Sequence, residues 1–373
     1  MVNTDKHTKD FTTDSKKESI ENINEIKNQD LLEKDRPGES YASLVKKQFK
    51  KNKMAVISVY VVIFFILMAL FADFLAYDKP LYVKYEGTTY FPVIKDYLVG
   101  LGISKWDPPT LININWKKLE DENKLESVVW PPIPYSAREV DLLNSLIKPG
   151  GDHYLGTDQV GRDLLSGLIH GSRISLSVGF VAAGIAAFIG VILGSIAGYY
   201  GGKVDITISR FIEIMLTFPL FFLIIVIVAI YGSSIWYVML AIGLTVWTRE
   251  ARLIRGEVLK VRNMEYVLAA NAVGLPTRKI IFRHVLPNSI APVLVSAAFA
   301  ISHAIIIEAA LSFFGLGVSA TTVTWGSLIN EGRTAPNAWW LAIFPGLMIF
   351  ISVVAYNLIG EGLRDALDPR LRD

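Results

Sequence analysis

The sequence has no cysteine and almost no net charge. Without cysteine, the chain can form neither disulfide bonds nor thiolate metal sites. A formal net charge of +2 on 373 residues is too small to indicate a nucleic-acid partner, and we expect none. The histidines are scattered without the paired spacing of metal ligands, so we expect no metal and no cofactor.

Catalytic and nucleotide-binding motifs are also lacking. The segment "GYYGGK" at 198–203 has the wrong spacing for a phosphate-binding loop, and Val204 stands where that loop requires serine or threonine. No nucleophile with an adjacent base emerges either. We therefore expect no enzymatic activity, and any ATP hydrolysis should belong to partner chains.

Apolar residues, in contrast, are abundant and occur in long runs. The hydrophobic share is 52% and the mean hydropathy is +0.39, more than a soluble domain usually carries. Only Gly232-Ser233-Ser234 separates two of the runs, but these turn residues favour two helices. We predict an all-α integral membrane protein whose six transmembrane helices occupy 54–72, 174–200, 218–231, 235–247, 290–314 and 339–360.

Lysine and arginine indicate the side of the membrane on which each loop lies. They are concentrated at 46–53, before the first run, and at 249–283, after the fourth, whereas the loop before the sixth run has only Arg333. Because basic loops stay in the cytoplasm, both termini should be cytoplasmic in a multi-pass protein of the cell membrane.

The chain divides into four predicted parts. Residues 1–45 are polar and poor in aromatics, which predicts a disordered cytoplasmic tail. A basic segment and the first helix follow at 46–76, and 77–155 should form an extracytoplasmic insertion between helices 1 and 2. Within it, "LYVKYEGTTYFPV" alternates about a Glu86-Gly87 turn, which predicts strands. Residues 156–373 should hold the other five helices and a cytoplasmic loop at 249–288.

That loop contains the organised stretch "EYVLAANAVGLPTRKIIFRHVLPN" at 265–288. Asn263 is a plausible N-cap for a first helix, and Gly274 is placed to end it. Pro276 can open a second helix, which should stop before Pro287. The resulting hairpin fits a docking element for another protein, although a solvated connector between spans is the alternative.

Two costly polar residues lie within the predicted fifth span. His303 and Glu308 should face the bundle interior, because an ionised group at the bilayer centre costs on the order of 3 kcal/mol. They are about one and a half turns apart and do not share a helix face. Each could line a pathway or make a hydrogen bond between helices.

Several motifs, in order, resemble a known family. They are "LVKKQFKKNKMAVIS", "HYLGTDQVGRDLLSGLIHGSRISLSVGF", "EAALSFFGLGV", "TWGSLINEGR", "WWLAIFPGL" and "AYNLIGEGLRDALDPRLR". The sequence is similar to the C-type permease subunits of ATP-driven (ABC) importers of oligopeptides and dipeptides, within the binding-protein-dependent transport system inner-membrane component family.

The resemblance implies the permease fold of type I ABC importers and a pathway that carries peptide. It also implies a homologous second permease subunit as heterodimer partner, two ABC ATPase subunits and an extracytoplasmic peptide-binding protein. Leu268 stands where the family's cytoplasmic coupling loop has glutamate. The residues that match this ATPase-coupling loop are Glu265, Tyr266, Ala269, Ala270, Gly274, Arg283, His284, Leu286 and Pro287. Those of the family's outer motif are Gly156, Thr157, Asp158, Gly161, Arg162 and Asp163.

Two alternatives remain at this point. An ABC permease of the same kind could carry nickel or another small solute. A self-sufficient secondary transporter, which belongs to a different class, would need ion coupling and charged groups near the bilayer midplane, for which His303 and Glu308 are the candidates.

Overall fold

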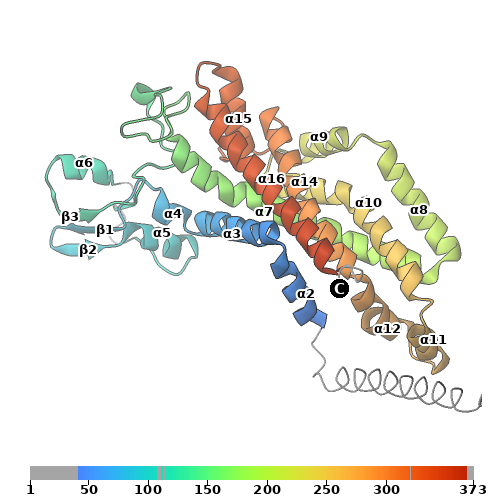
Figure 1. Cartoon of the computed structure of the whole chain (residues 1–373). Coiled ribbons are helices and arrows are strands. Elements are labelled where there is room, and N and C mark those ends of the chain that lie inside the picture. Colours follow the sequence, from blue (N-terminus) through green and yellow to red (C-terminus); the bar gives the residue numbers. More distant parts are fainter. Residues whose placement is uncertain (1–40, 107–110, 113, 320, 368–373) are drawn as a thin grey trace, which may run out of the picture.

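The computed structural model describes residues 41–106, 111–112, 114–319 and 321–367, and these are mostly helical. The long helix α7 lies at the centre of a bundle and contacts each of the other long helices (Figure 1). The long helices of the bundle are α3 (Lys53–Leu70), α7 (Leu164–Tyr200), α10 (Ile235–Val261), α14 (Ala291–Phe313) and α16 (Trp340–Leu367). Large apolar side chains on the outside of the bundle, such as Phe64, Phe188 and Phe350, are more than 60% exposed, as expected of a surface that contacts lipid.

Small residues allow α7 and α10 to approach closely. Gly190, Gly194 and Gly198 recur every fourth residue along α7, and this row faces α10. A Cβ on Gly194 would lie 2.0 Å from Cγ2 of Ile254 and 2.4 Å from the carbonyl oxygen of Ala251. Such rows of glycine are typical of membrane helices that pack backbone against backbone.

The third predicted span is not a single straight helix. Helix α8 (Gly202–Thr217) was not expected, and α9 (Leu220–Tyr231) follows it after a bend of 84° at Phe218 and Pro219. Proline cannot donate a backbone hydrogen bond, which explains the break at this point. The apolar run at 218–231 therefore forms only the second arm of a bent pair.

The structure supports fewer independent spans than the six predicted. In the described part of the chain, four helices are long and apolar enough to cross a membrane, or five if α8 and α9 count as one span. The fourth predicted span is the apolar start of α10, which continues to Val261. Arg249, Glu250 and Arg252 interrupt the apolar run of this helix. The finding is thus a helical protein with several membrane-spanning helices.

The prediction of a disordered tail over 1–45 is wrong for the last residues of this range, because they are helical. Residues 1–40 lie outside the described part, but α2 (Tyr41–Lys51) begins before residue 45. Val45 and Phe49 are half-buried on one side of α2, and Phe49 lies against Gly362 of α16. This apolar contact orders a segment whose composition looks too polar to fold.

The insertion contains the predicted strands. β1 (Tyr82–Tyr85) pairs antiparallel with β2 (Thr88–Tyr90) and with β3 (Leu125–Val129), in the order β2-β1-β3. Glu86 and Gly87 have φ of 50° and 74°, as a two-residue hairpin turn requires. Helix α4 (Ala72–Leu75) leads into the insertion, which also contains the short helices α5 (Pro92–Gly100) and α6 (Trp116–Asp121) and the 3₁₀ helix η2 (Leu142–Asn144).

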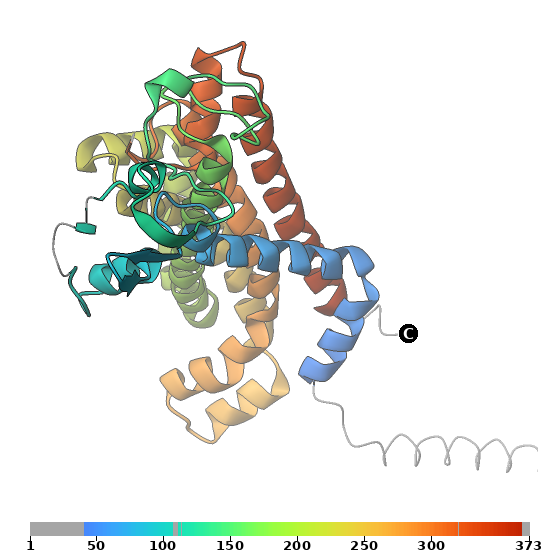
Figure 2. The ribbon, with the colours of Figure 1, turned by 90° about the vertical axis from the view of Figure 1, so that its left-hand side faces the viewer.

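The remaining helices lie at the two ends of the bundle. The short helix α15 (Trp325–Thr334) precedes α16 and lies near the same end as η2. At the other end, a hairpin links α10 to α14, close to α2 and the end of α16 (Figure 2). It consists of α11 (Glu265–Ala272), α12 (Thr277–Ile280), the π-helical turn η3 (Ile281–Val285) and α13 (Leu286–Ser289).

Candidate functional site

The first helix of the hairpin ends as the sequence predicts. Gly274 has φ +78°, a left-handed conformation that glycine adopts without steric cost. The Gly274 amide donates to the carbonyl of Asn271 at 3.0 Å, and the Leu275 amide donates to the carbonyl of Ala270 at 3.2 Å. This pair of hydrogen bonds is the Schellman arrangement, which reverses the chain and satisfies the last carbonyls of α11.

The start of α11 differs from the prediction. Met264, not Asn263, is the residue before the helix, and its side chain makes no capping hydrogen bond. The Asn263 side chain instead donates to the carbonyl of Leu259 in α10 at 3.0 Å. An asparagine close to two helix ends can bond with either one, and the end of α10 uses it here.

The second helix does not stop before Pro287. It continues through η3 and α13, so that Pro287 lies in the first turn of α13. The Leu286 amide donates to the carbonyl of Ile281, five residues back, which widens the helix by one residue. Since a wider turn relieves the clash that proline makes with the preceding turn, the helix accommodates Pro287.

The hairpin has a buried face and an exposed one. Val267, Ala270 and Ile280 pack with Ile254 and Val258 of α10, which fixes the hairpin to the bundle. On the exposed side, Leu268, Phe282 and Val273 are 52%, 70% and 80% exposed. We call these three residues the apolar set of the hairpin. Large apolar side chains outside the spanning helices are typical of a surface that binds another protein.

The structure places most residues of the predicted coupling loop at this surface, but not all of them. Ala270 is buried, and His284 and Leu286 are half-buried, so these three residues pack inside the hairpin and are not part of its exposed surface. The exposed ones are Glu265, Tyr266, Ala269, Gly274, Arg283 and Pro287. The sequence analysis missed the exposure of Val273 and Phe282, although both are large apolar residues in a polar loop.

The outer motif folds into a compact loop before α7. Asp163 caps α7 by accepting from the Ser166 amide at 2.7 Å, and its other oxygen lies 2.9 Å from Nδ1 of His153. Thr157 Oγ1 donates to the carbonyl of Asn144 and accepts from the Ile147 amide at 2.8 Å. The motif therefore fixes the end of the insertion to the start of the central helix.

Both glycines of the motif have left-handed backbones in crowded places. Gly156 has φ +81°, and a Cβ there would lie 2.6 Å from the carbonyl oxygen of Ile147. Gly161 has φ +80°, and its Cβ would lie 1.7 Å from the carbonyl oxygen of Asp141. These two positions require glycine for both conformation and space.

Arg162 joins the motif to α15. Its Nε donates to Asp158 at 2.5 Å, and its Nη2 donates to Glu331 at 2.6 Å, so two carboxylates share one guanidinium. Burial raises the pKa of Glu331 to about 8; the charge of Asp158 adds to this rise, and Arg162 opposes it. We therefore expect Glu331 to lose its proton in the neutral range of pH.

The stability of the folded protein should fall as pH rises across this range. The pKa of Glu331 is raised above its ordinary value of 4.5, so between that value and about 8 the folded state binds the proton more tightly than the unfolded state. We expect the unfolding temperature in detergent to fall from about pH 5 to about pH 9, and Glu331→Gln to make this slope shallower. If the unfolding temperature fell equally steeply with pH in the wild type and in Glu331→Gln, the raised pKa of Glu331 would be contradicted.

The two polar residues of α14 have different surroundings. Glu308 is fully buried, and its carboxylate accepts from Ser312 Oγ at 2.7 Å and from Ser175 Oγ of α7 at 3.4 Å. The Ser175 hydroxyl in turn accepts from the Trp325 amide at 3.2 Å. Glu308 therefore serves hydrogen bonding between helices, whereas His303 is exposed and lines a cavity of about 370 Å³.

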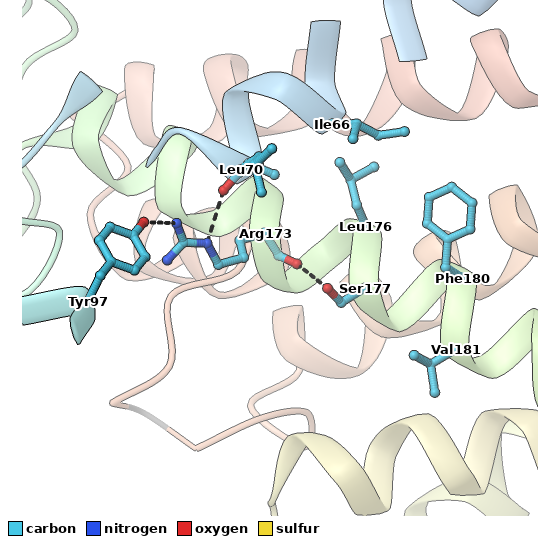
Figure 3. Close-up of a pocket in the computed structure, with 9 residues that line it drawn as sticks. Ile66, Leu70, Tyr97, Arg173, Leu176, Ser177, Phe180 and Val181 are labelled. Carbon is cyan, nitrogen blue, oxygen red and sulfur yellow. Dashed lines mark hydrogen bonds between the residues drawn. The ribbon is translucent and has the colours of Figure 1, made fainter. Parts of the chain in front are cut away.

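A further polar group, which the sequence analysis missed, connects the bundle to the insertion. Arg173 of α7 donates to the carbonyl of Ala69 at 3.0 Å, to Asp73 at 3.0 Å and to the Tyr97 hydroxyl at 3.2 Å. Figure 3 shows Arg173 and Tyr97 at one end of a cavity of about 530 Å³ whose other walls are mostly apolar side chains of α3 and α7, such as Leu70 and Phe180. The contact holds α5 against the end of the bundle that carries the insertion.

Comparisons with known proteins agree on one family. Residues 190–373 match the family described as "Binding-protein-dependent transport system inner membrane component", and residues 40–90 match the "N-terminal TM domain of oligopeptide transport permease C". A dipeptide transport system permease protein of Alkalihalophilus pseudofirmus is 35% identical over 327 residues, which cover 87% of this chain and 89% of the relative.

A second relative matches a shorter part of this chain. An oligopeptide transport system permease protein of Haemophilus influenzae is 40% identical over 242 residues, covering 65% of this chain and 78% of the relative. Among solved structures, an amino acid ABC transporter crystallised with histidines matches with a TM-score of 0.40 and 16% identity over 53% of this chain and 90% of that one. With 35% identity across most of both chains, this protein belongs to the inner-membrane permease components of binding-protein-dependent transport systems.

Proposed function

We propose that this chain is one permease subunit of an ATP-driven importer that carries dipeptides or oligopeptides across the cell membrane. The observation that carries the proposal is the similarity to a dipeptide permease over 87% of this chain. The match to an oligopeptide permease at 40% identity supports the same cargo class. In this role the chain lines a pathway and leaves ATP hydrolysis to other subunits.

The hairpin is the proposed site of coupling to an ATPase subunit. Its apolar set is exposed, and cations such as Arg278, Lys279 and Arg283 lie on its exposed side. Its buried face packs against Ile254 and Val258 of α10, so the hairpin and the end of that helix share one apolar core. A movement of the docked subunit would thus reach the membrane helices through α10 rather than be absorbed in a flexible loop.

The complete importer should contain a homologous second permease, two ABC ATPase subunits and an extracytoplasmic peptide-binding protein. The arrangement of the bundle supports the required orientation, because α2, the hairpin and the end of α16 share one end and the insertion lies toward the other. We place the first end in the cytoplasm, with both termini. Length and composition support five spans, namely α3, α7, the bent pair α8–α9, α14 and α16. In our proposal the apolar start of α10 is the sixth.

Purification from the native membrane tests this proposal. A C-terminal tag, mild detergent and mass spectrometry should recover a second homologous membrane chain and ATPases with Walker motifs. Proteoliposomes containing that complex and its binding protein should then take up labelled trialanine only with ATP. Recovery of this chain alone, together with uptake driven by an ion gradient, would favour a secondary transporter instead. ATP-driven uptake of nickel but not of peptide would show that the cargo is nickel, and the chain would still be an ABC permease.

A further inference from the structure

The cavity beside His303 combines apolar walls with exposed cations. It measures about 370 Å³ and lies between the α8–α9 bend, α10 and α14. Phe218, Pro219 and Leu220 of the bend supply apolar lining, and α10 supplies Arg249 and Arg252. A cavity of this size and character fits part of a small amphipathic molecule.

Arg249 is available to a ligand. Its side chain is exposed, and within the described residues it makes no hydrogen bond and no ion pair. The acidic residue of the lining, Glu250, is only 2% exposed and accepts a hydrogen bond from Ser296 of α14. The accessible charge of the cavity is therefore positive, and a guanidinium in apolar surroundings binds a carboxylate strongly and in a defined geometry.

The depth of the cavity in the membrane decides between a lipid headgroup and a transported solute as the anion that binds there. His303 lies near the middle of α14 (Ala291–Phe313), and at 1.5 Å per residue it is about 18 Å from the start of that helix and about 15 Å from its end. Lipid phosphates lie outside a hydrocarbon core of about 30 Å, so a headgroup would have to enter half the membrane to reach His303. A solute that crosses the membrane passes this depth in every cycle.

We propose that this cavity is a transit subsite for the C-terminal carboxylate of the cargo peptide, with Arg249 as its main partner and His303 as a second donor. The inference rests on the proposed function, because it takes peptide as the cargo. The α8–α9 bend accommodates the adjacent apolar part of the peptide. Every peptide with a free C-terminus carries the recognised group, so the subsite suits a transporter of varied sequences.

Uptake of trialanine and of its C-terminal amide tests the proposal. Proteoliposomes with the complete complex and binding protein would be compared, and uptake would be expressed per ATP hydrolysed. We expect Arg249→Gln to lower uptake of the free acid about tenfold and uptake of the amide much less, as loss of one charge-assisted hydrogen bond predicts. Because the binding protein is unchanged, its own preference cancels when each variant is compared with wild type.

A charge series gives a second, independent readout. For trialanine, Arg249→Lys should keep most uptake, Arg249→Gln should lose most of it, and Arg249→Glu should lose more. Lys203→Gln is the matched control, because it removes an exposed cation of α8 outside the cavity lining. It should change the uptake of neither substrate. Equal losses for acid and amide, or no order in the charge series, would overturn the subsite.

Two further outcomes have distinct meanings. If the effect of Arg249→Gln follows the content of anionic lipid in the vesicles and not the peptide terminus, the cavity binds a lipid headgroup and the proposal is wrong. If wild-type vesicles take up neither peptide, the proposed function fails before the subsite is reached.

Discussion

Replacing Gly274 by aspartate should abolish ATP-driven uptake while leaving the chain inserted in the membrane. Gly274 holds φ +78°, and a Cβ there would meet nothing within 4 Å, so space does not forbid the substitution. A left-handed conformation costs an ordinary residue about 1–2 kcal/mol, and aspartate less than most. The larger effect comes from a negative charge next to Val273, which is 80% exposed in the proposed docking surface.

Gly274→Asn is the matched control, because asparagine has nearly the same shape, tolerates the left-handed conformation and carries no charge. We expect this variant to keep most of the uptake, whereas Gly274→Asp should fall to background. Both should be present in the membrane fraction at the wild-type level. Normal uptake by Gly274→Asp would contradict the coupling role of the hairpin. Equal loss in both variants would assign the effect to the backbone and not to the docking surface.

Replacing Gly194 by valine should cause the largest loss of stability. Its Cβ would lie 2.0 Å from Cγ2 of Ile254 and 2.4 Å from the carbonyl oxygen of Ala251, so α7 and α10 would have to separate. Overpacking a well-fitted contact costs about 1–3 kcal/mol, and a clash with backbone that cannot move aside should exceed this range. The hairpin, our proposed coupling site, follows α10 directly, so uptake should also be lost.

Gly184→Val is the control for this prediction. Gly184 lies on the same helix, and a Cβ there would meet nothing within 4 Å. Thermal unfolding in detergent, followed by size-exclusion chromatography, should show a large decrease in midpoint for Gly194→Val and little change for Gly184→Val. Similar midpoints for the two variants would mean that the glycine row does not hold α7 against α10.

Hydropathy predicted the positions of the membrane helices better than their ends. Helix α7 begins at Leu164, ten residues before the predicted run, because His170 and Arg173 in its first part bond to Ala76 and Asp73 instead of to water. Polar residues in that stretch ended the apolar run in the sequence without ending the helix. The partners that satisfy them are distant in the chain, so no local pattern could indicate them.

Local chemistry was most informative at turns. The Glu86-Gly87 hairpin and the end of α11 at Gly274 are set by conformations that few residues adopt, and both predictions are confirmed. The prediction that the second helix stops before Pro287 is wrong, because the π-helical turn before this proline relieves the usual clash. The cavity beside Arg249 could not be predicted at all, since it requires the 84° bend between α8 and α9.

Cross-linking from the hairpin tests the central claim most directly. The chain has no cysteine, so Val273→Cys provides a single attachment point for a photoreactive maleimide. Leu143→Cys, which is 96% exposed in the insertion, is the control on the other end of the molecule. After illumination of native membranes, mass spectrometry should identify an ATPase with Walker motifs attached at Val273→Cys and not at Leu143→Cys. Labelled Val273→Cys that yields no ATPase adduct, in membranes where the complex is assembled, would contradict the account.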